Sequence, residues 1–143
     1  MRLPNVWLAI AGVASALIWV LHVAIIAGGP SWYRFFGAGE GMARLAEHGS
    51  PLHVVITASI SAVFLVFALY AFMPLPFRVP VLWTIAAVFL LRGLLVIPTL
   101  LGFTPLRMLP TIKPHDPFTL WSSLVSFTLG VVYALGTVHA MRE

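Results

Sequence analysis

The sequence predicts an all-α, membrane-spanning, antiparallel four-helix bundle. The chain is 61% hydrophobic and only 8% charged, its mean hydropathy is +1.04, and its apolar residues are collected in four long runs. Soluble domains carry about 25% charged residues. A helix of a soluble domain also keeps one polar face, whereas these runs are apolar all round. We therefore expect a single integral membrane domain over residues 1–143.

Four helices are expected to cross the membrane, at about residues 6–28, 51–73, 80–102 and 117–139. Each run is close to the roughly 20 apolar residues that a bilayer requires. The pairs Ser50-Pro51 and Asp116-Pro117 place an N-cap side chain before a proline at the first helical position of the second and fourth runs. Consecutive helices should be antiparallel neighbours, with both termini on one side.

Charge and cysteine content exclude several classes of protein. The net charge is +4, but the basic residues are scattered singly near the ends of the apolar runs, which is typical of headgroup anchoring. The sequence contains no basic cluster of the kind that binds nucleic acid, so binding to nucleic acid is not predicted. Because the chain has no cysteine, it has neither a disulfide framework nor a thiolate metal site.

The third run contains Arg92 near its middle, and an ionisable residue at that depth is a functional-site hypothesis by default. The apolar runs contain no Asp or Glu, so a carboxylate partner must come from a loop. We predict that the first loop folds over the bundle and places Glu40 or Glu47 about 2.7–2.9 Å from Arg92, or that a ligand anion takes that place.

Polar side chains should gather around Arg92 at one end of the bundle. His22 lies about 9 Å before the end of the first run, at 1.5 Å rise per residue. An arginine in a low-dielectric pocket suits a carboxylate or a phosphate. The candidate site for an anionic or amphipathic small molecule, or a lipid, comprises Arg92, His22, His53, Glu40, Glu47, Ser122, Ser123 and Trp121.

Both central residues also have purely structural interpretations. Arg92 can be satisfied by a loop carboxylate, by hydroxyl groups and by carbonyls that Pro98 leaves free, with no ligand bound. His22 can be an ordinary hydrogen-bonded residue of the bundle.

Metal, haem and hydrolytic chemistry have weaker support. A metal site would draw on the histidines of one membrane side, without HxxxH or HxxE spacing: His22, His48, His53 and His115. His22 and His53 differ by about two turns in depth, which disfavours haem. Ser122 or Ser123 with His53 and Glu47 makes a catalytic triad on paper, but no nucleophile elbow accompanies it. The sequence leaves the identity of any cofactor unknown.

Small residues recur every four positions along the fourth run, at Ser122, Ser126, Gly130 and Ala134. Membrane helices approach closely where side chains are small. This stripe therefore predicts either close packing within the bundle or a seam between copies of a homo-oligomer.

Three short motifs stand out, at residues 32–43 (WYRFFGAGEGMA), 90–94 (LLRGL) and 120–124 (LWSSL). In these motifs the chain resembles a family of short, uncharacterised bacterial four-span membrane proteins with no established activity. The resemblance implies a bacterial inner-membrane protein in which Arg92, residues 37–40 and the pair Ser122-Ser123 match the family's motifs. It leaves the ligand open.

Two alternative functions, from different classes, are therefore considered. One is a binding protein or small transporter for an anionic or amphipathic ligand around Arg92 and His22. The other is a non-enzymatic accessory subunit or homo-oligomer whose polar residues only hold the helices together. A membrane enzyme is a third possibility.

Overall fold

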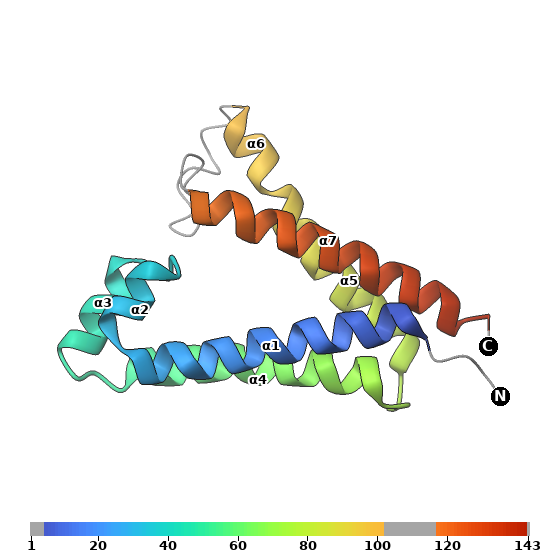
Figure 1. The fold of residues 1–143 in the computed structure, drawn as a ribbon, viewed down its shortest axis with the longest axis horizontal. Coiled ribbons are helices and arrows are strands. Elements are labelled where there is room, and N and C mark those ends of the chain that lie inside the picture. Colours follow the sequence, from blue (N-terminus) through green and yellow to red (C-terminus); the bar gives the residue numbers. More distant parts are fainter. Residues whose placement is uncertain (1–4, 102–116, 143) are drawn as a thin grey trace.

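The computed structural model describes residues 5–101 and 117–142, and every regular element in that part of the chain is a helix. In order they are α1 (Val6–Gly28), α2 (Pro30–Phe35), α3 (Glu40–Glu47), α4 (Leu52–Phe72), α5 (Arg78–Leu94), α6 (Val96–Leu100) and α7 (Pro117–Ala140) (Figure 1). The predicted all-α bundle is confirmed.

Four segments of the described chain are long and apolar enough to cross a membrane: α1, α4, residues Arg78–Pro98, and α7. No more than 28% of the most apolar part of any of them is buried. Large apolar side chains therefore cover much of the outer surface. Such a surface is stable in lipid but would be an aggregation hazard in water.

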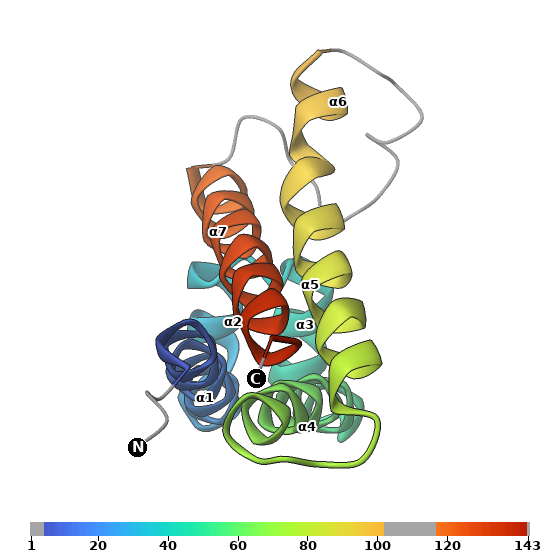
Figure 2. The ribbon, with the colours of Figure 1, turned by 90° about the vertical axis from the view of Figure 1, so that its right-hand side faces the viewer.

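The four long helices are arranged as two antiparallel pairs. α1 packs along α4, and α5 packs along α7 (Figures 1 and 2). The pairs meet where α1 begins and α7 ends, and there the side chain of Asn5 donates a hydrogen bond of 2.8 Å to the carbonyl of Gly136. From that end the pairs diverge toward α2 and α3 (Figure 1).

The main core lies where the two pairs meet, and a tyrosine joins three helices there. Tyr133 of α7 is fully buried and stacks on Phe89 of α5, with ring centroids 5.8 Å apart. Its hydroxyl hydrogen-bonds Ser15 of α1 at 2.7 Å and donates to the carbonyl of Phe67 in α4 at 3.2 Å. A second, smaller cluster of Ile25, Tyr33 and Ala43 lies beneath α2 and α3.

Glycines allow α5 and α7 to approach closely. A Cβ atom on Gly93 would lie 2.7 Å from the backbone nitrogen of Phe127, and one on Gly130 would lie 2.8 Å from that of Leu90. Ala134, another residue of the small-residue stripe, packs against the main core. These contacts favour the interpretation in which the stripe serves packing within the chain, while the homo-oligomer seam stays a prediction.

Helix boundaries fall within one or two residues of those predicted. Asn5 caps α1 by accepting a hydrogen bond from the backbone N–H of Leu8 at 3.1 Å. α4 begins at Leu52, with Pro51 rather than Ser50 in the N-cap position. The predicted cap of the fourth helix, Asp116, lies outside the described residues.

The third predicted span begins two residues early and is interrupted. α5 starts at Arg78, whose guanidinium donates to the carbonyls of Tyr70 and Ala71 at the end of α4, and the preceding Phe77 is left-handed with φ 55°. The helix breaks at Leu95, between α5 and α6. The proline ring at position 98 disturbs the carbonyl four residues earlier, at Leu94, which accounts for the break.

Candidate functional site

Arg92 lies in the last turn of α5 and reaches across to α7. Its Nη1 donates to the hydroxyl of Ser123 at 2.9 Å, and its Nη2 donates to the hydroxyl of Ser122 at 3.1 Å. Both serine hydroxyls donate in turn to the carbonyl of Thr119, at 3.1 Å from Ser122 and 2.7 Å from Ser123. The guanidinium is thus held by a short polar ladder in otherwise apolar helices.

Helix geometry explains why this contact forms. Gly93 follows Arg92 directly, and its missing side chain lets the backbone of α7 approach at Phe127, one turn below Ser123. The two serines lie five and six residues after Pro117, or about 8 Å along α7 from its first residue. Arg92 therefore has its hydroxyl partners inside the helical layer, below the loops.

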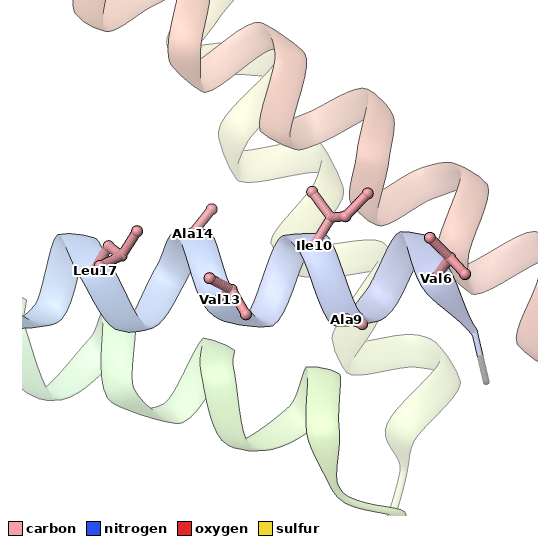
Figure 3. Close-up of a pocket in the computed structure, with 6 residues that line it drawn as sticks. All are labelled: Val6, Ala9, Ile10, Val13, Ala14 and Leu17. Carbon is pink, nitrogen blue, oxygen red and sulfur yellow. The ribbon is translucent and has the colours of Figure 1, made fainter.

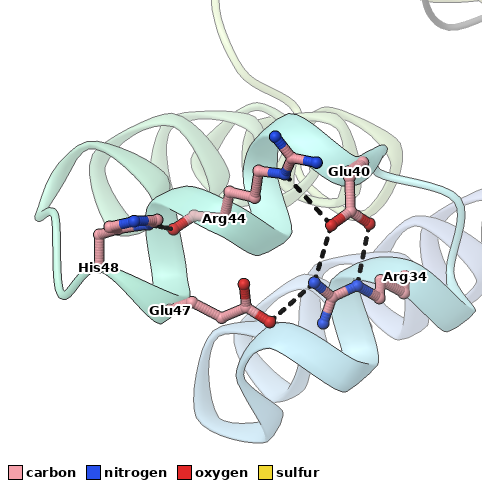
Figure 4. Close-up of polar contacts among 5 residues, drawn as sticks. All are labelled: Arg34, Glu40, Arg44, Glu47 and His48. Carbon is pink, nitrogen blue, oxygen red and sulfur yellow. Dashed lines mark hydrogen bonds and ion pairs between the residues drawn. The ribbon is translucent and has the colours of Figure 1, made fainter.

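The predicted contact between Arg92 and Glu40 or Glu47 is not formed. Both carboxylates bind Arg34 of α2 instead: Glu40 accepts from Nε and Nη2 of Arg34 at 2.9 Å each, and Glu47 accepts from Nη2 at 2.7 Å (Figure 4). Arg44 adds a weaker contact to Glu40 at 3.5 Å. Arg34 precedes Glu40 by only six residues, so this pairing requires far less loop closure than one with Arg92.

The paired charges alter each other's titration. The guanidinium of Arg34 lowers the pKa of Glu40 to about 2, chiefly by donating hydrogen bonds to the charged carboxylate. The pKa of Arg34 is raised above its ordinary value by its hydrogen bonds to Glu40 and Glu47. These groups are exposed, and their network stabilises the contact between α2 and α3 at the loop surface.

The first loop does fold onto the bundle, although its acids do not reach Arg92. Phe36, which ends α2, makes an edge-to-face contact with Phe118 of α7 at 6.4 Å between ring centroids. Gly37 has φ 68°, and a Cβ atom there would lie 2.5 Å from the ring of Phe118. Phe118 precedes Ser122 by one helical turn. An aromatic contact therefore lies above the polar ladder where carboxylates were expected.

Each of the two candidate histidines hydrogen-bonds a backbone carbonyl three or four residues before it in sequence. The Nδ1 of His22 hydrogen-bonds the carbonyl of Ile18 at 2.8 Å, and its ring stacks on Phe64 of α4 at 5.1 Å. Phe64 in turn contacts Phe89, which precedes Arg92 by three residues. Instead of facing Arg92 directly, His22 lies on the far side of an aromatic contact.

His53 contacts the smaller cluster beneath α2 through Tyr33. Its Nδ1 hydrogen-bonds the carbonyl of Ser50, and its ring makes an edge contact with Tyr33 at 5.6 Å. In both His22 and His53 the carbonyl partner can only accept, so Nδ1 is the donor.

The structure does not bring together the groups that the metal and hydrolytic interpretations require. Among residues 5–101 and 117–142, no three His, Asp or Glu side chains lie close enough to share a metal ion. His115 lies outside that part of the chain. The members of the hypothetical catalytic triad have other partners. Glu47 pairs with Arg34 and His53 with the carbonyl of Ser50, while Ser122 and Ser123 bind Arg92.

Trp121 lines an apolar groove between α1 and α7. The groove has a volume of about 440 Å³ and is formed by Ala14, Leu17 and Ile18 of α1 with Trp121, Leu124, Val125, Thr128 and Leu129 of α7. We call it the α1–α7 groove. Trp121 itself is 67% exposed, so it projects from the helix surface beside Ser122.

Sequence reasoning missed two polar contacts beside the site. Tyr33 is 1% exposed, and its hydroxyl hydrogen-bonds Thr57 of α4 at 3.0 Å, which anchors α2 to the long helices. Arg34 was not expected to take both loop acids. The signal for that contact was the short separation between Arg34 and Glu40, at the two ends of a turn marked by Gly37 and Gly39.

Four long apolar helices that are largely exposed define a multi-pass membrane protein, in which an arginine–serine contact joins α5 to α7. No family model, curated protein or solved structure matches the chain. What the protein does must therefore be argued from the site itself.

Proposed function

We propose that this protein binds an anionic, amphipathic molecule within the membrane, with the anion on Arg92. The observation that carries the proposal is the pairing of a guanidinium with two uncharged hydroxyls, Ser122 and Ser123. An arginine side chain stays protonated in proteins. The hydroxyls satisfy two N–H groups, but they do not neutralise the charge.

The loop acids that the structure describes are already engaged. Glu40 and Glu47 both pair with Arg34, at the loop surface. The described contacts of Arg92 use two of its five N–H donors. A carboxylate or a phosphate fits the remaining fork of donors and supplies the missing negative charge.

The surroundings of Arg92 favour an amphipathic ligand over a free inorganic anion. Ser122 adjoins Trp121 and lies one turn from Val125, and both of these line the α1–α7 groove. A hydrated anion would have to shed its water to enter such a layer, which is costly. A molecule with an apolar part enters from the lipid with that part already desolvated.

Amphiphiles that share a dodecyl chain test the proposal. Protein purified in dodecyl maltoside should gain thermal stability on addition of dodecanoate or dodecyl phosphate but not of dodecanol. Binding at a hundredfold excess over Kd stabilises by about 2.7 kcal/mol. Arg92→Gln should abolish the gain. Arg142→Gln is the matched control, because it removes the same charge from an exposed position near the end of α7.

The second candidate is a structural role in which Arg92 only fastens α5 to α7. The contact with two serines beside the Gly93 approach favours it. Under this interpretation Arg92→Gln lowers the stability of the ligand-free protein, and anionic and uncharged amphiphiles act alike on both proteins. Equal responses to dodecanoate and dodecanol in the wild type would therefore refute the binding proposal.

A further inference from the structure

The α1–α7 groove is a hollow of suitable size and chemistry for a hydrocarbon chain. Its volume of about 440 Å³ lies within the roughly 300–1,000 Å³ of small-molecule sites. Thr128 brings the one polar side chain to its lining, and that hydroxyl donates to the carbonyl of Leu124 at 2.9 Å. The groove therefore offers apolar contact and little hydrogen bonding.

The groove begins at the level of the Arg92 ladder. Nη2 of Arg92 lies 3.1 Å from the hydroxyl of Ser122. Ser122 does not line the groove itself, but it adjoins Trp121 in sequence and lies about one turn from Val125, both of which do. From Trp121 the wall continues to Leu129, eight residues or about 12 Å further along α7. A ligand with its anion at Arg92 can thus extend its chain from the polar ladder toward the middle of the helix.

The depth of the ladder favours one headgroup class. A helix of 24 residues such as α7 is about 36 Å long, whereas the hydrocarbon core of a bilayer is about 30 Å thick. With α7 centred in the bilayer, Ser122 lies several ångströms below the core boundary. Phosphodiester headgroups occupy the polar region outside that boundary. A carboxylate is smaller than a phosphodiester and matches the guanidinium fork.

We infer that the α1–α7 groove holds the hydrocarbon chain of a long-chain carboxylate, whose carboxylate group binds Arg92 beside Ser122. This inference rests on the proposed function and adds the ligand class and the path of its chain. Charge complementarity at one end of the groove and an apolar wall along the rest distinguish this site from ordinary lipid contact.

The outer face of α1 provides an internal comparison. Val6, Ala9, Ile10, Val13, Ala14 and Leu17 form a shallow apolar surface of about 450 Å³ (Figure 3). It matches the groove in volume and shares Ala14 and Leu17 with it, but its other four residues extend toward the beginning of α1, away from the Arg92 end. Lipid that merely surrounds the protein should occupy both surfaces equally.

Photo-crosslinking with a palmitate analogue that carries a diazirine near its chain end tests the inference. In the wild-type protein, labelling should fall on residues 14–18 and 124–129 rather than on residues 6–13. Arg92→Gln should reduce labelling of the groove by about tenfold or more, because it removes a charge-assisted hydrogen bond. Equal labelling of both surfaces, unchanged by Arg92→Gln, would overturn the inference.

A pair of matched variants tests the groove without touching the arginine. Val125 lines the groove and is 51% exposed, whereas Val13 lines only the outer face of α1 and is 53% exposed. Val125→Trp should fill the groove and reduce both the labelling and the one-to-one palmitate adduct seen by native mass spectrometry. Val13→Trp should leave both unchanged.

The outcomes separate this inference from the proposed function. A one-to-one adduct that needs Arg92 but is unchanged in Val125→Trp refutes the groove and leaves the anion site standing. If the protein retains dodecyl phosphate in preference to dodecanoate, the assignment of the ligand as a carboxylate is wrong, but the anion site stands. If the wild type retains no anionic amphiphile, both proposals are wrong.

Discussion

Arg34 and Arg92 are both held by side-chain hydrogen bonds, yet their partners differ in kind. Arg34 is 41% exposed and binds two carboxylates, Glu40 and Glu47, from a helix that follows within a few residues. Arg92 is partly buried and binds two serine hydroxyls, 30 and 31 residues away. One arginine is neutralised at the surface, while the other has uncharged hydrogen-bond partners among the described residues.

This difference separates a contact that completes a surface loop from a contact that joins two long helices. The Arg34 network completes the fold of the first loop, because each charge has a partner. The contact of Arg92 with Ser122 and Ser123 fixes the position of a positive charge in α5, and under the proposed function its other donors bind an anion.

The largest effect is expected from Gly93→Ala. The added Cβ would lie 2.7 Å from the backbone of Phe127, so α5 and α7 must move apart. Overpacking of this kind costs about 1–3 kcal/mol. Thermal unfolding in detergent measures the loss, and anion binding at Arg92 should weaken with it because the serines move away.

Gly41→Ala is the control for that substitution. A Cβ atom on Gly41 meets nothing within 4 Å, and the residue lies in the first turn of α3. Alanine favours a helix over glycine by about 0.5–1 kcal/mol, so this variant should be neutral or slightly more stable. Equal destabilisation by both substitutions would contradict the close approach at Gly93.

An intermediate effect is expected from Ser122→Ala and Ser123→Ala. Each removes one hydroxyl acceptor from Arg92, and hydrogen bonds between membrane helices are worth about 0.6 kcal/mol on average, up to about 1.7. Thermal unfolding of the two single variants and the double variant measures their coupling. Ser59→Ala is the control, because that hydroxyl binds only its own helix, at Val55. A double variant as stable as the control would show that the ladder does not hold Arg92.

A smaller, local effect is expected from Glu40→Gln. The substitution removes the carboxylate that accepts two hydrogen bonds from Arg34, so the turn between α2 and α3 should open. Hydrogen exchange of residues 36–40 should accelerate, with little change in the unfolding of the long helices. Arg44→Gln removes only the contact at 3.5 Å and should have a weaker effect. Equal acceleration in both would contradict the assignment of Arg34 as the main partner.

The smallest effect concerns acid pH. Because the pKa of Glu40 is lowered from an ordinary 4.5 to about 2, the folded loop favours the charged carboxylate. Its stabilisation is fully present above about pH 4.5 and is lost as the pH falls toward 2. Carbon NMR of the Glu40 carboxyl should show a midpoint near 2. A midpoint near the ordinary value would mean that the Arg34 pair does not persist in solution.

The long helices follow directly from the sequence. A run of apolar residues bounded by proline and glycine has few alternatives in lipid, where backbone groups must be satisfied within the helix. For this reason α1 begins and ends at the predicted residues. The interruption at Leu95 is also traceable to one residue, Pro98, although the sequence did not fix the position of the break.

The partners of Arg92 were harder to predict. Because no acid lies within the apolar runs, the loop residues Glu40 and Glu47 were the expected partners of Arg92. Arg34, which is nearer in sequence, pairs with both acids. The two serines bind Arg92 instead, because Gly93 allows α7 to approach α5 closely. That approach depends on how two helices cross, which a single sequence does not encode in any short motif. The contact between the near neighbours Arg34 and Glu40 was not predicted. Hydroxyl groups, by contrast, were among the expected partners of Arg92, and Ser122 and Ser123 were in the candidate site.

The pairing of α5 with α7 also bears on how the chain enters the membrane during synthesis. α1 and α4 form one helical hairpin, and both are complete before Arg92 leaves the ribosome. The serines that receive Arg92 lie in the helix made next, so the charged segment enters the insertion machinery ahead of its partners. A chain stopped after residue 101 would expose Arg92 to lipid without either hydroxyl. Integration of the third segment should therefore depend on synthesis of the fourth.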